Sequence, residues 1–283
     1  MRQLLRFGYD GAAFRGWARQ PKLRTIEGEI RAGLVRQGIQ SSTDTLRLEV
    51  ASRTDRGVSA RGNALTLESD LAPGALLRAM NGLAPEIFFT AIARVDESFP
   101  VRHAVRRVYR YFEPPGDHDA HRWERVAQLM VGEIDVRSFG RGIPSEHPMI
   151  RTVQSIRVAS LESGLVVEVT GPSFVWNQVR KMVGALRAVE SGKLAPDRLR
   201  AAARGERRIS LPLAEPDRLV LWDVEFPVEW ELRWSGPNRR QRKHWEESLA
   251  AMWSRSKILS AFEGENPTPV SRPAPTVRAS GRR

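Results

Sequence analysis

The chain of 283 residues contains no cysteine, only three tyrosines and only five histidines. The absence of cysteine excludes disulfide bonds, thiolate catalysis and the common zinc-finger ligand sets, and it fits a reducing compartment. His118 and His121 could lie on one helical turn, but no third ligand stands nearby at metal spacing, so a surface pair is expected. No segment approaches the ~18 apolar residues of a membrane span, and the apolar run at the start is too short for a signal peptide. We therefore predict a cytoplasmic protein with no metal site and no membrane segment.

Positive charge is in excess. The chain has 45 lysines and arginines against 33 acidic residues, a formal net charge of +12. Such an excess indicates a polyanionic partner, most often nucleic acid, and the arginines cluster near aromatic residues. A generally basic, soluble surface is the alternative. Because 41% of the residues are hydrophobic, the chain can bury a core of one large domain or two moderate ones.

Hydrophobic periodicity and turn residues predict the same order of elements twice, β-α-β-β-α-β. The first half reads as strand 2–9, helix 25–38, strands 45–51 and 62–69, helix 74–83 and strand 86–95. The second half reads as strand 104–113, helix 119–132, strands 152–161 and 164–171, helix 174–192, a short helix 196–204 and strand 217–226. This order is that of the ferredoxin-like split unit.

The predicted fold class is therefore α+β. Two ferredoxin-like units would form a pseudo-symmetric antiparallel-sheet protein with a central cleft. We expect an N-terminal half over residues 1–103, a C-terminal half over 104–228 and a basic extension over 229–283. The extension would hold a helix near 238–257, and its last ~20 residues, rich in Pro, Ser and Arg, are expected to be mobile.

The segment "ASRTDRGVSARGN", residues 51–63, surrounds Asp55 with Arg53, Arg56 and Arg61 between two expected strands. A hairpin loop needs turn residues, and it does not need three arginines. Nearby cations favour the ionised form of a carboxylate and attract phosphate. Taken alone, however, a loop aspartate is more often a turn or cap residue than a catalytic one.

Five motifs, spread from residue 9 to about residue 226, carry a resemblance to a known family. "SRTDRGVSA" resembles the "GRTDAGVHA" signature of the TruA family of tRNA pseudouridine synthases, and "YDGAAFRGWARQP" resembles its "YDGTxFxGWQxQP". "RVYRY", "GEIDVRSF" and "FVWNQVRKMVG" resemble its "RxYRY", "GEHDFxSF" and "FLxxxVRxMVG". The chain departs from the family pattern at Ser52, Arg56 and Ser59, which replace Gly, Ala and His, and at Glu27, which replaces Gln.

The resemblance implies an enzyme that converts uridine to pseudouridine in the anticodon stem-loop of tRNA, at positions 38 to 40. It implies no cofactor or metal, a homodimer and the two-unit fold. It also implies four site residues. Asp55 would be the nucleophile, Arg53 would displace the target nucleotide, Tyr109 would stack on the flipped uracil and assist proton removal from C5, and Arg180 would pair with the carboxylate of Asp55.

Plainer interpretations of the same residues stay open. Arg53 can be a phosphate contact or a solvated loop charge, Tyr109 a half-buried strand tyrosine, and Arg180 a solvated helix charge. Tyr111, on the same strand face as Tyr109, is assigned no role, and Lys181 is expected to face solvent or phosphate.

Two other classes of function compete with the enzyme. One is a non-catalytic RNA-binding protein of the same fold, but the third strand, "GNALTLES", lacks the aromatic residues that such a domain needs. The other is a metabolic enzyme that binds a small anion, which the net charge and the basic tail make less attractive.

Overall fold

The structure is a computed structural model that describes residues 1–39, 46–143, 149–234 and 236–262. Residues 1–238 form one compact unit, and helix α6 (Arg239–Phe262) belongs to a second. Helix α6 covers the helix expected near 238–257. The tail expected to be mobile, beyond residue 262, lies outside the described residues.

The first half of the larger unit has the predicted order. It consists of β1 (Arg2–Tyr9), the 3₁₀ turn η1 (Gly11–Ala13), α1 (Ile26–Arg36), β2 (Leu48–Val50), β3 (Ser59–Glu68), α2 (Pro73–Met80) and β4 (Ile87–Arg94). Helix α1 begins as expected at the N-cap Thr25, whose side chain accepts a hydrogen bond from the backbone N–H of Gly28. Its apolar stripe, Ile26, Ile30 and Leu34, is fully buried.

The second half contains one hairpin more than predicted. It consists of β5 (Arg106–Glu113), α3 (Ala120–Ala127), η2 (Gln128–Met130), β6 (Gly132–Asp135), β7 (Ile150–Val153), β8 (Ser155–Leu161), β9 (Gly164–Gly171), α4 (Gln178–Glu190), α5 (Pro196–Ala203), η3 (Pro216–Arg218) and β10 (Leu219–Glu225). The single strand expected over 152–161 is wrong. It breaks at Gln154, because β7 pairs with β6 in a separate two-stranded sheet while β8 pairs with β9.

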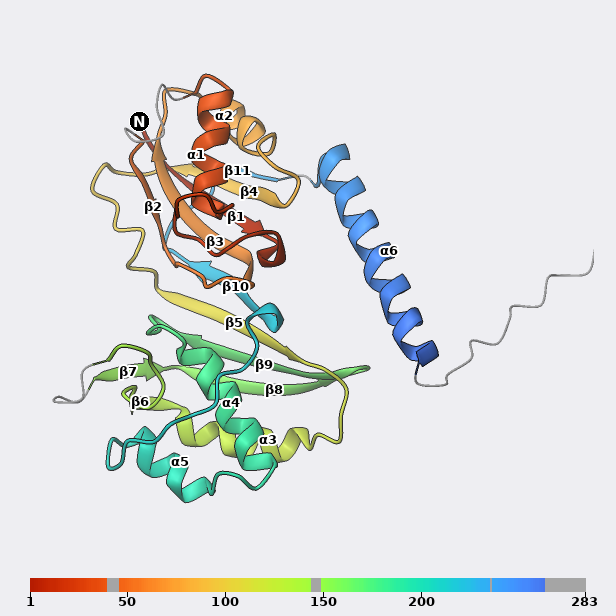
Figure 1. Ribbon diagram of the computed structural model, residues 1–283. Coiled ribbons are helices and arrows are strands. Elements are labelled where there is room, and N and C mark those ends of the chain that lie inside the picture. Colours follow the sequence, from red (N-terminus) through yellow and green to blue (C-terminus); the bar gives the residue numbers. More distant parts are fainter. Residues whose placement is uncertain (40–45, 144–148, 235, 263–283) are drawn as a thin grey trace, which may run out of the picture. The chain divides into compact units, whose positions relative to one another are not determined.

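The two halves share one sheet, in the order β11-β4-β1-β3-β10-β5-β9-β8, with β2 added beside β3. Strand β11 (Leu232–Arg233), from the segment expected to begin the extension, pairs with β4. The pairs in this sheet are antiparallel except β3 with β10, which joins the halves. Helices α1 and α2 lie along the first half and α3 to α5 along the second (Figure 1). The predicted α+β class and the repeated strand order are confirmed.

Each half has its own hydrophobic core. The first core joins α1, α2 and β1 to β4 with Leu221 and Val224 of β10, and the second joins β5, β8 and β9 with α3, α4 and α5. Strand β10 thus contributes to the first core although it is part of the second half in sequence. No helix in the described part of the chain combines the length and apolar character needed to cross a membrane.

Candidate active site

The loop that carries Asp55, residues 51–58, is held by the segment that follows β1. A Cβ atom added to Gly11 would lie 2.3 Å from the carbonyl oxygen of Val58, so only glycine allows this approach. Gly16, at φ 93°, packs against the same loop, and the Tyr9 hydroxyl lies 2.7 Å from the Thr54 hydroxyl. The motif "YDGAAFRGW" therefore has a structural reason, since it supports the loop that carries the acid.

A buried arginine of β5 fixes the start of this loop. The Arg107 guanidinium donates to the Ser52 hydroxyl at 2.8 Å, to the carbonyl oxygens of Ala51 at 2.9 Å and Arg102 at 2.8 Å, and to that of Pro172. Burial lowers the pKa of Arg107, and no carboxylate of the described residues pairs with it. Ser52, a departure from the family pattern, is thus a hydrogen-bond partner that ties the first half to the second.

Sheet register brings Tyr109 close to the loop. Leu221 of β10 pairs with Ala60 on one side and with Tyr109 on the other. Because neighbouring strands are about 4.8 Å apart, Tyr109 lies roughly 10 Å across the sheet from Ala60, two residues after the loop. Its ring meets Phe174 edge to face at 5.4 Å. Burial raises the pKa of the Tyr109 phenol, so the group is neutral at neutral pH.

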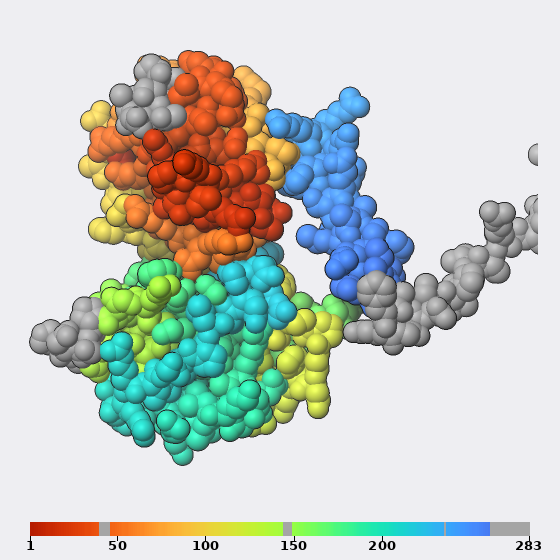
Figure 2. All heavy atoms as spheres, viewed as in Figure 1, coloured from red at the N-terminus to blue at the C-terminus, as the bar shows by residue number. Residues whose placement is uncertain are grey.

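A pocket of about 870 Å³ lies where the two halves meet, which confirms the predicted cleft. Figure 2 shows the orange residues near the loop bordering the green and cyan residues of the second half. All four predicted site residues line this pocket: Arg53, Asp55, Tyr109 and Arg180. The fold therefore gathers residues from three distant segments around one space large enough for a nucleotide.

The carboxylate of Asp55 is held from the N-terminal end of α4. One oxygen accepts a hydrogen bond from Trp176 Nε1 at 2.9 Å, and the other lies 3.5 Å from the guanidinium of Arg180. Arg180 also donates to the Ala214 carbonyl at 2.7 Å and to the Asn177 side-chain oxygen at 3.3 Å. The predicted pairing of Arg180 with Asp55 is confirmed, although through one long contact and not through a two-pronged fork.

Comparisons with known proteins identify the family. A family model described as tRNA pseudouridine synthase matches residues 126–227. The chain is 37% identical to tRNA pseudouridine synthase A of Thermococcus kodakarensis over 229 residues, which is 80% of this chain and 85% of the relative. It is 35% identical to the Pyrococcus furiosus protein of the same name, over 86% of this chain and 91% of that one. The chain belongs to the tRNA pseudouridine synthase A family.

It is therefore an enzyme that isomerises uridine to pseudouridine in tRNA. Family membership decides against the non-catalytic RNA-binding protein and the metabolic enzyme. Among solved structures, a Cbf5-Nop10-Gar1 complex is similar with a TM-score of 0.37 and 13% identity, over 65% of this chain and 44% of that one.

The three arginines that flank Asp55 in sequence do not pair with it, so the interpretation that they surround the carboxylate is wrong. Arg53 and Arg56 are exposed and line the pocket, while Arg61 stacks over the Trp222 ring at 4.7 Å, outside the pocket. Side chains of successive loop residues point in different directions, so proximity in sequence does not bring their charges together. Within the described residues, the cation beside Asp55 is Arg180.

Trp176 is a site residue that sequence reasoning missed. The helix predicted over 174–192 includes Trp176, but α4 begins only at Gln178, after Asn177 in the left-handed region at φ 69°. Trp176 therefore lies in the preceding loop, where its side chain is 53% exposed and the Arg141 guanidinium covers its ring at 4.6 Å. The available signal was a tryptophan within the motif "FVWNQVRKMVG" of a basic chain that resembles an RNA-binding enzyme.

Lys181 does not face solvent as expected. Its ammonium group donates to the carbonyl oxygens of Ser138 at 3.2 Å and Gly140 at 2.9 Å. Burial is the larger cause of the lowered pKa of Lys181, and repulsion from Arg208 is the smaller one. This lysine therefore ties α4 to the loop after β6.

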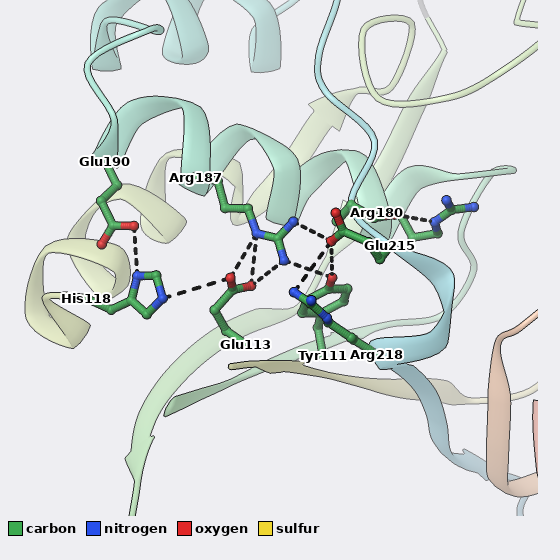
Figure 3. A network of polar contacts seen from close by, with 9 residues as sticks. Tyr111, Glu113, His118, Arg180, Arg187, Glu190, Glu215 and Arg218 are labelled. Atoms are coloured by element: carbon green, nitrogen blue, oxygen red, sulfur yellow. Dashed lines mark hydrogen bonds and ion pairs between the residues drawn. The ribbon is translucent and has the colours of Figure 1, made fainter. Parts of the chain in front are cut away.

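A polar network two helical turns along α4 supports the synthase site from behind (Figure 3). Arg187 donates to both oxygens of the buried Glu113, at 2.7–3.1 Å, to Glu215, and to the Tyr111 hydroxyl at 3.0 Å. The bond from Arg187 lowers the pKa of Glu215 to about 2. Tyr111, which was assigned no role, is a fully buried core residue, and its hydroxyl donates to Glu215 at 3.0 Å.

This network positions Arg180 through segment 211–218. Glu215 holds the segment to α4 through Arg187. The neighbouring Ala214 donates its backbone N–H to the Arg180 carbonyl, and its own carbonyl accepts a hydrogen bond from the Arg180 side chain. The segment lies so close to the helix that a Cβ atom added to Gly184 would lie 2.1 Å from the Pro212 carbonyl oxygen. The guanidinium next to Asp55 is thus oriented by a backbone carbonyl that is itself fixed.

The histidines form no metal site in the described part of the chain, where no group of three or more His, Asp and Glu could hold an ion. His118 instead lies 2.9 Å from a carboxylate oxygen of Glu190, at the edge of the same network.

Proposed function

We propose that the enzyme modifies uridines at positions 38 to 40, in the anticodon stem-loop of tRNA, and that Asp55 is its nucleophile. One observation carries the assignment of Asp55. Among the described residues that line the pocket between the halves, Asp55 provides the single carboxylate. The charged residues that share this lining are all arginines: Arg15, Arg53, Arg56, Arg102, Arg107 and Arg180.

Pseudouridylation breaks the C–N glycosidic bond, rotates the freed uracil and forms a C–C bond from C5 to the same ribose carbon, with loss of the proton from C5 and gain of a proton at N1. A carboxylate can carry this by covalent attack on the ribose or on the base ring, followed by its own release. Its contacts with Trp176 and Arg180 come from one side, which leaves Asp55 a third exposed toward the pocket. Trp176 and Arg180 hold the carboxylate in one orientation before the substrate arrives.

Tyr109 provides a stacking face for the flipped uracil. Stacking of a base on an aromatic side chain is worth about 1–3 kcal/mol, and Phe174 braces the ring from its edge. Because the raised pKa keeps the phenol neutral, Tyr109 is suited to donate a hydrogen bond. We assign acceptance of the C5 proton to the released Asp55 carboxylate, and to Tyr109 the role of holding the base during that step.

Arg53 lies where it can stabilise the tRNA with its target uridine flipped out of the helix. Chemistry on a stacked base requires extrusion of the nucleotide, which costs a few kcal/mol. Arg53 lies at the pocket wall, two residues from Asp55, and is exposed without an ion pair to any described residue. Its guanidinium can enter the space that the target uridine leaves, or hold the phosphate next to it.

The test is release of tritium from tRNA that carries uridine tritiated at C5. We expect Asp55→Asn to keep wild-type thermal stability and tRNA affinity and to lose turnover, because no second carboxylate of the described residues lines the pocket. Residual turnover within about tenfold of the wild type would reject Asp55 as nucleophile.

The target position is tested separately. Transcripts that keep uridine at only one of positions 38, 39 and 40 should each release tritium with the wild-type enzyme, and a transcript without uridine at all three should not. The homodimer and the cytoplasmic location implied by the resemblance remain proposals, and light scattering of the purified enzyme tests the dimer.

A further inference from the structure

A second pocket, of about 590 Å³, lies behind segment 211–214, between the end of α4, helix α5 and the chain that follows α5. Its floor is apolar and includes Leu194, Ile209 and Leu211. Its lining also includes four exposed cations: Lys193, Arg198, Arg207 and Arg208. An apolar floor beside several positive side chains is the composition that suits a nucleotide, whose base is flat and whose phosphate is charged.

The charge of this pocket is not balanced by the part of the protein that the structure describes. No acidic residue is among the described lining residues, and none of the four exposed cations forms an ion pair with a described residue. Arg187, at the pocket wall, differs because Glu113 and Glu215 neutralise it. Repulsion from Arg208 adds to burial in lowering the pKa of Lys181. The pocket therefore has the electrostatics of an anion site.

The pocket lies on the same face of α4 as Arg180. Positions 180, 184, 187 and 191 follow a helical stripe. Arg180 lines the cleft that holds Asp55, and Gly184, Arg187 and Ser191 line the second pocket. Seven residues of helix separate Arg180 from Arg187, a rise of about 10 Å. An RNA strand that places one nucleotide in the cleft can therefore reach the second pocket with a nearby one.

We propose that this pocket binds a nucleotide of the tRNA other than the target. Its backbone phosphates contact Lys193, Arg198, Arg207 and Arg208, and its ribose or base lies on the apolar floor. The inference rests on tRNA being the substrate, and it depends neither on Asp55 as nucleophile nor on the position of the target.

The test compares two triple variants that remove the same charge. The pocket variant is Arg198→Gln with Arg207→Gln and Arg208→Gln. The control is Arg78→Gln with Arg125→Gln and Arg157→Gln, three exposed arginines that line neither pocket. The replaced side chains are exposed in the wild-type enzyme, so both variants should fold. Thermal melting checks that they do. Arg208→Gln alone serves as a second pocket variant with a smaller expected change in the same direction.

For the pocket variant we expect Kd and KM for full-length tRNA to rise roughly tenfold or more, with kcat within twofold of the wild type. The plot of the logarithm of the tRNA association constant against the logarithm of the salt concentration should become less steep by about 2 to 3, because each arginine removed takes away one phosphate contact. The control should change Kd by less than about threefold. A pocket variant that behaves like the control overturns the proposal.

A calorimetric titration of wild-type enzyme with UMP and with pyrophosphate separates RNA phosphate from a free anion. Binding of either probe that is lost in the pocket variant, while tRNA affinity stays at the wild-type value, assigns the pocket to a free anion and overturns the proposal. Kd is also measured in an Asp55→Asn background, where no product is expected. A pocket effect on Kd there supports this site even if the catalytic assignment fails.

Discussion

Two arginines of α4, two turns apart, differ in how their charges are satisfied. Arg187 makes several short bonds to Glu113, Glu215 and Tyr111, and its charge is satisfied. Arg180 reaches the Asp55 carboxylate through one contact of 3.5 Å and is otherwise held by neutral oxygens. A contact of that length is weak, so the guanidinium of Arg180 can still bind a polar or charged group of the substrate. The guanidinium of Arg187 is already fully hydrogen-bonded within the protein.

The largest expected effect is the loss of stability in the variant Arg187→Met. The buried Glu113 would lose its cation, which typically costs about 3–5 kcal/mol. In a unit of this size the thermal midpoint should fall by roughly 10 °C, as measured by calorimetry. Turnover per folded molecule, assayed well below the midpoint, should fall less than in Arg180→Met. The double variant Arg187→Met with Glu113→Gln should recover part of the loss, and no recovery would mean that the ion pair is not the cause.

Arg180→Met should show the opposite pattern. We expect turnover to fall roughly a hundredfold, because misplacement of a reacting group by about 1 Å can cost that much, while the thermal midpoint stays within a few degrees. Arg180→Lys keeps the charge but not the planar group that reaches both Asp55 and Ala214, so its turnover should lie in between. Tritium release and thermal melting together check this. Wild-type kinetics in the Met variant would make Arg180 an ordinary helix charge.

Trp176 is the second group that holds Asp55. Trp176→Phe keeps an aromatic ring but removes the N–H that donates to the carboxylate. Loss of a hydrogen bond to a charged group costs about 1.5–3 kcal/mol, so kcat should fall roughly tenfold or more with KM little changed. Trp176→Ala should also raise KM if the exposed ring stacks on RNA. Equal kinetics of the Phe variant and the wild type would show that the bond does not position the nucleophile.

The smallest expected effect is the pH dependence of the Arg187 network. Arg187 lowers the pKa of Glu215 from 4.5 to about 2. The ionised carboxylate is therefore favoured by folding, and its contribution to stability is fully present above pH 4.5 and is lost as the pH falls toward 2. Glu215 is half exposed, so the contribution is modest. Glu215→Gln should flatten the acid decline of the thermal midpoint between pH 4.5 and 2, relative to the wild type. An unchanged decline would contradict the contribution.

Local features of the sequence predicted local structure well. Helix α1 could be predicted from the N-cap Thr25 and one apolar stripe, because both act within a few residues of each other. The strand expected over 152–161 could not be divided correctly, because its break at Gln154 depends on pairing with β6, which is distant in sequence. Helix α4 was expected four residues too early, since the left-handed turn at Asn177 is not visible in an apolar pattern.

The sequence by itself determined the family, the order of the elements apart from the β6–β7 hairpin, and the choice of candidate nucleophile, because motifs and periodicity are properties of neighbouring residues. Only the tertiary structure decided which cation stands beside Asp55. It is not one of the three arginines within six residues but Arg180, 125 residues away, aimed by a carbonyl of segment 211–218. The same holds for Arg187 with Glu113 and Glu215, and for the second pocket. The physical reason is that charges act over distances in space, and a chain brings distant residues within a few ångströms only after its strands have paired and its helices have packed.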